Sequence, residues 1–498
     1  MIDTAALREK VLDLAIKGKL VPQDPTDEPA SVLLERIHEQ KLQMVREGKL
    51  KAKDVKDDTI IFKGDDNCYY EKFSDGTIKN IQDEIPFDLP YGWSWCRLKC
   101  ICPYGECDNV ECSEIKNDDW ILDLEDIEKD SGKILAFAKK SDKNSISTKH
   151  KFYQGQLLYS KLRPYLNKVV IAPKAGYCTS EILPLLFWGD IDVHYMQMYL
   201  MSNVFLSYTD KISYGVKMPR LGTADGKQAL IALPPNNEQK LIAKTFQDIL
   251  PALETIKTEQ CALEDIINLL KSKVLELAIQ GKLVPQDEND ESANVLLERI
   301  RTERKAKLGK KYVESYIFKG DDNCYYENND GKVAIVNEFL PFDLPDGWAY
   351  VRLENVLNYE QPTEYIVEST DYRSEYKTPV LTAGKSFIIG YTNETVGIKS
   401  ELPVIIFDDF TTDSKFVNFP FKVKSSAMKI LTADKLSIDT KYAYYVMQTV
   451  ECDHETHKRY WISEYGRTII GLPPLNEQLK IVNQIEYLFS LLDNGKEP

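Results

Sequence analysis

The chain has 498 residues, a length that predicts roughly two to four domains instead of one compact core. Apolar residues make up 43% of it. No run of about 18 apolar residues and no secretory signal pattern occurs, so we expect a cytoplasmic protein without a membrane span. The formal net charge of −15 argues against a chain that holds nucleic acid by its overall charge, because phosphate contacts need Lys and Arg.

The chain opens with a helical segment, 1–50, followed by a connector, 51–91. Apolar residues recur at helical spacing over 5–17, which predicts a first helix. The motifs of these two segments are LREKVLDLAIKGKLVPQD (7–24), SVLLERI (31–37), FKGDDNCYYE (62–71) and PFDLPYGW (86–93).

Residues 92–235 predict a mainly β domain with a helix at 192–207. Runs rich in Val, Ile, Phe and Tyr, such as FYQGQLLYSKLRPYLNKVVIAP (152–173), are broken by Gly, Pro and Asn. Residues 105–130 hold eleven Asp or Glu, whereas residues 133–174 hold nine Lys. This separation of charge predicts a basic face on an acidic body.

Five cysteines crowd into the start of this domain: Cys96, Cys100, Cys102, Cys107 and Cys112. A zinc site is one interpretation of the cluster. No CxxC pair and no nearby His occur, so reduced thiols are the favoured interpretation and we expect no metal.

Residues 236–310 predict a long helical spacer. It begins at LPPNNEQ (233–239), and apolar residues keep helical spacing from 237 to 280. Asn236 or Asn237 is expected to cap its start and Gly281 its end, while Pro251 is expected to kink or divide it.

A connector (311–346), a second mainly β domain (347–474) and a C-terminal helical segment (475–498) complete the order. The second domain has a β-rich stretch at 403–431 and a helix at 439–450. The last segment is expected to form a helix over 476–493.

The chain carries an internal duplication. LKSKVLELAIQGKLVPQD (270–287), FKGDDNCYYE (318–327), PFDLPDGW (341–348) and LPPLNEQ (472–478) repeat motifs of the first half. In the middle of the chain, LPPNNEQ, a long helical stretch and KLVPQD follow one another as one block. The second copy of this block is split: its first part, from LPPLNEQ, ends the chain, and its second part, up to KLVPQD, begins the chain. We predict an α+β fold in a circular pseudo-twofold arrangement, with two mainly β domains separated by two antiparallel long-helix regions.

Residues 94–232 and 349–471, the stretches between the repeated motifs, do not match each other. A repeated frame with two unlike inserts is typical of a protein that distinguishes two features. No catalytic motif is evident: the only Pro-Pro pairs start helices, Gly384-Lys385-Ser386 lacks the first glycine of a P-loop, and His454 and His457 have no further ligand at a recognised spacing.

LPYGWSWCRL (89–98) and LPDGWAYVRL (344–353) each open an insert that LPPxNEQ and a long helix close. These motifs, over essentially the whole chain, resemble the specificity subunits of type I restriction-modification systems, although Tyr350 replaces the second Trp of the pattern. The resemblance implies that each insert is a target-recognition domain for one half of a bipartite, asymmetric site in double-stranded DNA, and that the helices set the gap between the halves.

The resemblance also implies partners. Two modification subunits, which bind S-adenosylmethionine, would dock on the frame, and restriction or motor subunits, which use ATP and Mg²⁺, would complete the complex. The chain itself would be non-catalytic and would hold no cofactor. Bound modification subunits would also supply positive surface that the acidic chain lacks.

The candidate DNA contacts follow from basic and aromatic residues in the inserts. Arg163 is the first candidate for guanine, since its planar fork suits O6 and N7. An ordinary solvated surface residue is the alternative at each position, and phosphate contacts are favoured over base contacts. The candidates are Lys161, Arg163, Tyr165, Asn167, Lys168, Lys217 and Arg220 in the first insert and Lys385, Ser386, Tyr391, Thr411, Thr412, Lys415 and Arg459 in the second.

Three other classes of function stay open. A stand-alone DNA-binding regulator is disfavoured by the acidity and by the lack of a helix-turn-helix signature. A protein-binding scaffold predicts no sequence-selective protection of DNA. An enzyme with an unfamiliar site is the least favoured.

Overall fold

The structure is a computed structural model that describes residues 2–143, 146–215, 217–309, 312–384, 386–434, 437–452 and 459–495, without the side chain of Leu308. Lys385, His454 and His457 lie outside the described residues. The chain forms two compact units, Ile2–Glu259 and Gln260–Pro498. Across the described ranges, no helix combines the length and the apolar character that crossing a membrane requires.

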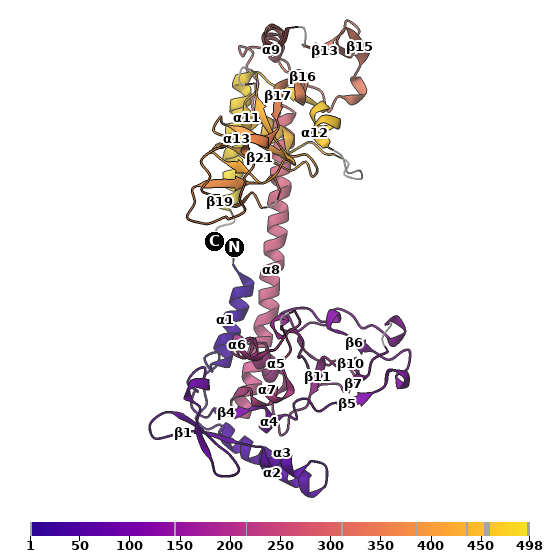
Figure 1. The fold of residues 1–498 in the computed structure, drawn as a ribbon. Helices are drawn as coiled ribbons and strands as arrows, with labels where there is room; N and C mark the ends of the chain where they lie inside the picture. Colours follow the sequence, from indigo (N-terminus) through magenta and orange to yellow (C-terminus); the bar gives the residue numbers. More distant parts are fainter. Residues whose placement is uncertain are drawn as a thin grey trace. The chain divides into compact units, whose positions relative to one another are not determined.

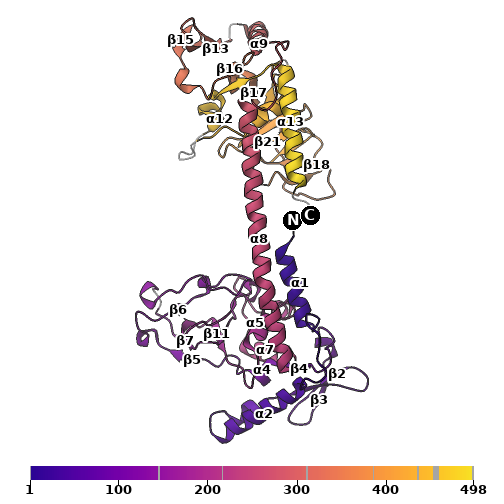
Figure 2. The ribbon, with the colours of Figure 1, turned by 180° about the vertical axis from the view of Figure 1, so that it is seen from behind.

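The first unit combines frame helices, a small sheet and the first insert. Helix α1 runs antiparallel to the start of α8: Arg8 lies 5.9 Å from the ring centre of Phe246, and Leu12 shares a core with Ile242 (Figures 1 and 2). The frame elements are α1 (Thr4–Ile16), α2 (Ala30–Arg46), α3 (Ala52–Lys56), β1 (Ile60–Lys63), β2 (Tyr69–Lys72), β3 (Ile78–Asn80) and α8 (Asn236–Ile279).

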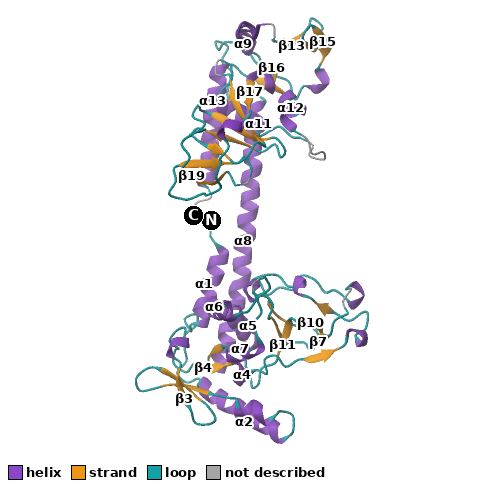
Figure 3. Cartoon of the chain, viewed as in Figure 1, coloured by secondary structure: helices purple, strands orange, loops and turns teal. Residues whose placement is uncertain are grey.

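The first insert is closed at its base by the antiparallel pair β4 and β12. Between them lie a four-stranded sheet in the order β5-β7-β10-β6 and a three-stranded sheet in the order β11-β8-β9. Figure 3 labels β7 and β10 of the first sheet and β11 of the second. The predicted helix over 192–207 is two helices, because Ser202 separates them and caps the second. The elements are β4 (Ser94–Arg97), α4 (Leu98–Ile101), β5 (Asp108–Val110), β6 (Ile121–Leu122), β7 (Lys149–Phe152), β8 (Leu157–Ser160), β9 (Val169–Ile171), β10 (Gly176–Thr179), β11 (Ile182–Leu185), α5 (Val193–Met201), α6 (Asn203–Ile212), α7 (Thr223–Gln228) and β12 (Leu230–Leu233).

The acidic and basic stretches of this insert pair with each other in space. Lys143 Nζ lies 3.0 Å from Asp126 Oδ2 and 3.2 Å from Glu125 Oε1, and Lys139 Nζ lies 2.9 Å from Asp118 Oδ1. These contacts neutralise part of the basic stretch, so the predicted basic face is smaller than the sequence suggested. The clustered cysteines are free thiols, and four of the five are buried.

The second unit repeats this plan. Helix α13 runs antiparallel to the last part of α8, with Lys271 Nζ 2.8 Å from Asp493 Oδ1 and Ile481 in one core with Leu275. The strands β16 and β24 close the second insert, which holds sheets in the orders β17-β23-β20-β21 and β19-β18-β22. The elements are α9 (Ala293–Leu308), β13 (Ser315–Lys319), β14 (Tyr325–Asn329), β15 (Lys332–Ile335), β16 (Ala349–Arg352), α10 (Leu353–Val356), β17 (Leu357–Glu360), β18 (Thr378–Leu381), β19 (Ile388–Thr392), β20 (Val404–Asp408), β21 (Ser414–Val417), β22 (Lys422–Val423), β23 (Met428–Ala433), α11 (Thr440–Met447), α12 (Tyr460–Ser463), β24 (Ile469–Leu472) and α13 (Leu475–Asn494).

Helix α8 continues through Pro251, so the proline does not divide the helix, although an interior proline removes one backbone hydrogen bond. The side-chain amides of Asn236 and Asn237 donate to Asp190 O and to Asp27 Oδ1, so they tie the helix start to neighbouring segments. Gly281 has a φ of +66° just beyond the helix, as expected for a C-terminal glycine.

Three frame segments meet in the same way in each unit. The indole Nε1 of Trp93 donates to Glu238 at 2.9 Å, and that of Trp348 donates to Glu477 at 3.1 Å. The glutamine of each KLVPQD motif donates to the same carboxylates, at 3.3 and 3.1 Å. The repeated motifs thus form two matching junctions, one in each unit.

These junctions predict a pH dependence. Burial raises the pKa of Glu238 and of Glu477 above the ordinary 4.5, against the effect of their hydrogen bonds. A carboxyl with a raised folded-state pKa stabilises the fold when protonated, and this contribution is lost as the pH rises through that pKa. We therefore expect Glu238→Gln to gain stability relative to the unmodified chain as the pH rises above 4.5.

Unfolding free energies measured between about pH 5 and about pH 8 test this expectation. Glu477→Gln should behave in the same way, and Asp83→Asn, at an exposed site, should show no such trend. A constant difference between Glu238→Gln and the unmodified chain at all pH values would contradict it.

Candidate nucleic-acid interface

The two inserts share a three-stranded arrangement although their sequences do not match. In the first insert β8 lies between β11 and β9, and in the second β20 lies between β23 and β21, with all four pairings antiparallel. In both inserts a loop leads from the central strand to the next strand along the chain, from β8 to β9 and from β20 to β21. We name these the β8–β9 loop (161–168) and the β20–β21 loop (409–413).

Backbone hydrogen bonds put Lys161 and Asp409 in equivalent positions. The N–H of Lys161 donates to Glu181 O at 3.0 Å, and that of Asp409 donates to Ala427 O at 3.1 Å. The carbonyl of Lys161 accepts from Leu221 N at 3.0 Å, and that of Asp409 accepts from Tyr460 N at 2.9 Å. Each loop is therefore held against a segment that returns much later in the chain.

This equivalence also matches two predicted site residues. Arg220 directly precedes Leu221, and Arg459 directly precedes Tyr460. The structure thus joins the β8–β9 loop to Arg220 and the β20–β21 loop to Arg459, which lie far apart in sequence. Each insert presents one loop and one arginine-bearing return segment side by side.

Both loops contain a residue in the left-handed region. Arg163 has a φ of +49° and Thr412 a φ of +60°. This conformation is uncommon for a residue other than glycine and is an outlier for β-branched Thr. Such strain persists where the surroundings enforce it, and it clusters at binding and catalytic sites.

The side chains of the β8–β9 loop fall into two groups. Tyr165 is exposed, and Arg163 is half-buried with no hydrogen-bond partner for its buried Nε among the described residues. Asn167 is buried and donates to Met201 O at 3.0 Å, while Lys168 Nζ donates to Leu124 O at 2.6 Å. Burial lowers the pKa of Lys168. Arg163 and Tyr165 are therefore better placed for an external ligand than Asn167 and Lys168.

The two residues of the first return segment also differ. Lys217 is exposed. Arg220 makes a bidentate ion pair with Glu181, whose oxygens lie 3.1 and 3.2 Å from its nitrogens. Hydrogen bonds with Glu181 raise the pKa of Arg220. Arg220 thus ties the return segment to Glu181, which directly precedes β11, and the exposed Lys217 is the more accessible of the two cations.

In the second insert the position equivalent to Glu181 is Ala427, so the acid that pairs with Arg220 has no counterpart at that position. Arg459 is exposed. Thr411 is exposed and caps the loop through Asp413 at 3.0 Å, and the half-buried Lys415 lies on β21. Arg459 is therefore the more accessible of the two equivalent arginines.

A buried ion pair holds the second site together. Asp409 Oδ1 accepts from Trp461 N at 2.9 Å, and Asp409 Oδ2 lies 3.4 Å from Lys429 Nζ. Asp409 and Lys429 are 2% and 1% exposed. The pair fixes the loop to the start of α12 and thus sets the position of Arg459.

Two predicted residues lie elsewhere. Ser386 is exposed before β19, and the half-buried Tyr391 lies on β19, in the sheet that does not contain the β20–β21 loop. No hydrogen bond between described residues joins them to that loop. Lys385, predicted with them, is outside the described residues.

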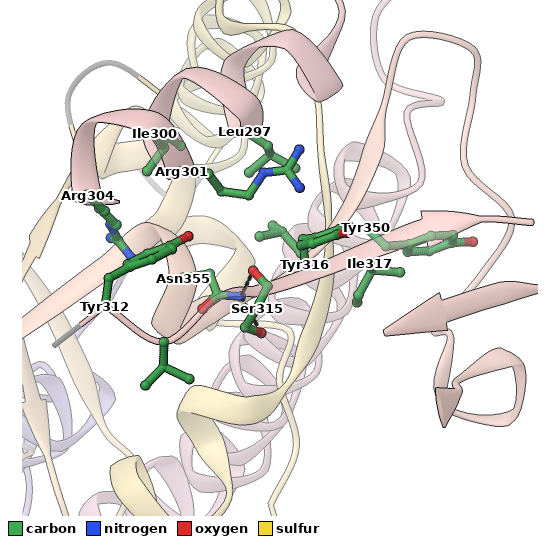
Figure 4. Close-up of a pocket in the computed structure, with 12 residues that line it drawn as sticks. Leu297, Ile300, Arg301, Arg304, Tyr312, Ser315, Tyr316, Ile317, Tyr350 and Asn355 are labelled. Atoms are coloured by element: carbon green, nitrogen blue, oxygen red, sulfur yellow. Dashed lines mark hydrogen bonds between the residues drawn. The ribbon is translucent and has the colours of Figure 1, made fainter. Parts of the chain in front are cut away.

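A cavity of about 50 Å³ lies in the second unit between α9, β13 and α10, with Arg301, Arg304 and Tyr316 in its wall (Figure 4). Arg301 lies 4.3 Å from the ring centre of Tyr316, and Figure 4 shows its guanidinium turned away from Arg304. None of the predicted site residues lines it.

Over the part of the chain that the structure describes, no group of three or more His, Cys, Asp or Glu is placed to hold a metal.

Sequence reasoning missed Glu181, Asp409 and Lys429. Glu181 orients Arg220, and the buried pair orients Arg459. No sequence signal marks them, because their roles depend on contacts between segments separated by 20 to 52 residues. They position the predicted contacts instead of making them.

No protein-family model matches the chain. The type I restriction enzyme EcoR124I/EcoR124II specificity subunit of Escherichia coli is 50% identical over 143 residues, which cover 28% of this chain and 35% of that subunit. The EcoEI specificity subunit of Escherichia coli is 24% identical, over 98% of this chain and 90% of that subunit. The high identity therefore spans about a third of the first relative, and the long alignment has low identity.

A solved structure concerned with complex assembly and conformational transition of the type I R-M system contains a similar chain. The two align over 82% of this chain and 93% of that one, with a TM-score of 0.51 and 16% identity. This likeness is one of fold and supports the mixed α and β architecture.

Proposed function

The chain is a homologue of type I restriction enzyme specificity subunits, and we propose that it is the DNA-recognition subunit of such a restriction-modification complex. Each insert reads one half of a bipartite, asymmetric site in double-stranded DNA. The chain itself is non-catalytic and acts in the cytoplasm. The observation that carries this proposal is the pair of equivalent loop-and-arginine sites on a repeated frame.

The finer architecture belongs to the same proposal. α1 runs toward the first junction and α13 runs away from the second, so α13 and α1 together correspond to the two ends of α8. We propose that they pack as a broken second copy of that helix. Domain boundaries near residues 92, 236, 347 and 475 follow from this plan.

The repeated frame is proposed to dock two modification subunits and to fix the gap between the half-sites. S-adenosylmethionine, ATP and Mg²⁺ would be bound by modification and restriction subunits. The unlike inserts make the target asymmetric, because the two loops differ in charge and shape. The β8–β9 loop is basic, whereas the β20–β21 loop contains two aspartates.

Replacing Arg163 by Ala is expected to weaken binding at the first half-site by about 1–3 kcal/mol, the range for an arginine that contacts a guanine edge. The left-handed φ of +49° at Arg163 supports this role, as does the hydrogen bond from its backbone N–H to Pro219 O, which holds the loop against the return segment. Binding would be measured by competition with DNA duplexes in which one half-site is scrambled.

Arg459→Ala is the matched variant and should affect the second half-site alone. Tyr153→Ala, at an exposed position outside the loop, should change neither. Equal losses on both kinds of scrambled duplex would contradict the assignment of Arg163 to one half-site.

Mapping methylated adenines across a genome with and without this gene tests the proposed function as a whole. A bipartite methylated sequence that disappears with the gene is the expected result. Unchanged methylation together with protein-only partners would favour a scaffold.

A further inference from the structure

The duplication leaves one identical stretch on the surface of both units. FKGDDNCYYE occupies 62–71 and 318–327 and, with the isoleucine that precedes it in both copies, is the longest identical run between the two halves. It forms the first two strands of β1-β2-β3 in one unit and of β13-β14-β15 in the other. The structure explains why some of these residues are the same, but not all of them.

The inner face of each small sheet is anchored to its own unit. Glu71 pairs with Arg97 at 2.7 Å, and Glu327 pairs with Arg352 at 2.5 Å. The turn between the first two strands is also the same in both copies. Asp66 accepts a hydrogen bond from Tyr70 Oη at 2.7 Å, and Asp322 accepts one from Tyr326 Oη at 2.7 Å. These contacts require Asp, Tyr and Glu at their places.

Phe62 and Asp65, with their equivalents Phe318 and Asp321, form no side-chain hydrogen bond or ion pair with another described residue. Both phenylalanines are exposed, by 38% and 37%, and each stacks on the tyrosine of the neighbouring strand with ring centres 5.9 Å apart. The ring centre of Phe318 also lies 5.7 Å from that of Tyr316. Asp65 and Asp321 are exposed. An exposed side chain is freer to change after a duplication than a buried one, so the identity of these exposed residues in both copies indicates a shared external requirement.

The outer face of each sheet carries exposed apolar side chains among polar ones. By strand register Phe62, Tyr70 and Ile78 share one face with Lys72 and Asn80. In the second copy Phe318, Tyr326, Val333 and Ile335 share one face with Asn328. Ile78 and Val333 are 54% and 56% exposed. The outward face of such a sheet is ordinarily polar, and an exposed apolar patch marks an interaction site.

The acids at the turn favour a protein over DNA as the ligand of this face. Two neighbouring aspartates border the apolar residues in each copy, although Lys72 lies on the same face of the first sheet. Phosphates would be repelled there, whereas a protein surface with a Lys or Arg beside an apolar side chain is complementary.

We propose that the two outer faces, with Asp65 and Asp321, are matched docking surfaces for one partner protein that binds in two copies. The partner presents an apolar side chain next to a basic one. This inference rests on the proposed function, under which the modification subunit is the partner present twice.

The test uses the full-length chain and the purified modification subunit. Asp65→Lys should lower the affinity for one of two bound modification subunits by at least about tenfold, because it sets like charges against each other. Asp321→Lys should do the same to the other subunit, and the double variant should lose both. Native mass spectrometry gives the stoichiometry, and titration gives the affinities.

Asp83→Lys is the matched control, since it makes the same charge change at an exposed site on the same connector, outside the identical run. Phe62→Ser tests the apolar part and should also release one subunit. Unchanged melting temperatures show that the variants fold.

A double variant that binds two modification subunits as tightly as Asp83→Lys does would overturn the inference and leave the proposed function standing. An unmodified chain that binds no modification subunit would overturn both. Equal stepwise losses for the two single variants would support the docking surfaces.

Discussion

Replacing Glu71 by Ala is expected to lower the free energy of unfolding of the first unit by about 3–5 kcal/mol. Glu71 and Arg97 are 2% and 4% exposed, and Arg97 Nη2 lies 2.7 Å from Glu71 Oε2. Burial opposes ionisation of Glu71, but the hydrogen bonds from Arg97 and Thr59 outweigh it and lower the pKa. Removing the carboxylate leaves a guanidinium buried with only partial compensation from Glu84.

The second copy of the frame supplies a matched control for this prediction. Glu327 and Arg352 form the same pair, but their side chains are 13% and 21% exposed. Water reaches this pair, so Glu327→Ala should cost only roughly 1 kcal/mol. Unfolding in denaturant would be monitored by hydrogen exchange of the backbone amides of β4 and β16. This gives the free energy of unfolding of each unit separately. Equal costs for the two variants would show that burial does not set the strength of this contact.

The helical frame was predictable because its signals are local. Apolar spacing predicted helices over 5–17 and 476–493, and the structure has α1 at Thr4–Ile16 and α13 at Leu475–Asn494. The repeated motifs predicted two equivalent bodies, and the Trp93–Glu238 contact recurs as Trp348–Glu477. Motifs that recur together in sequence meet in space because the same side chains satisfy one another.

The recognition sites were predictable only in part. The sequence singled out Arg220 and Arg459 but treated them as similar surface cations. The two arginines differ because Glu181 pairs with Arg220, whereas the equivalent position in the second insert is Ala427. Only the backbone hydrogen bonds of the folded chain show that these two positions are equivalent. The expected basic face is smaller for the same reason, because spacing along the chain does not reveal which acids pair with Lys139 and Lys143.

Replacing Asp409 by Ala is expected to destabilise the second unit by about 3–5 kcal/mol and to weaken binding at the second half-site. The substitution leaves the Lys429 ammonium uncompensated in a site where it is 1% exposed. It also removes the acceptor of the Trp461 N–H, two residues from Arg459. Arg459 therefore loses its fixed position, while the first half-site should be bound as before.

Asp409→Asn combined with Lys429→Met separates charge from packing in this prediction. The asparagine oxygen keeps the acceptor for Trp461, and the methionine removes the buried charge, so most of the lost stability should return. If binding at the second half-site returns with it, the buried pair acts by positioning Arg459. If stability returns and binding does not, the Asp409 carboxylate itself matters to the DNA contact, and the β20–β21 loop would need a direct role for that group.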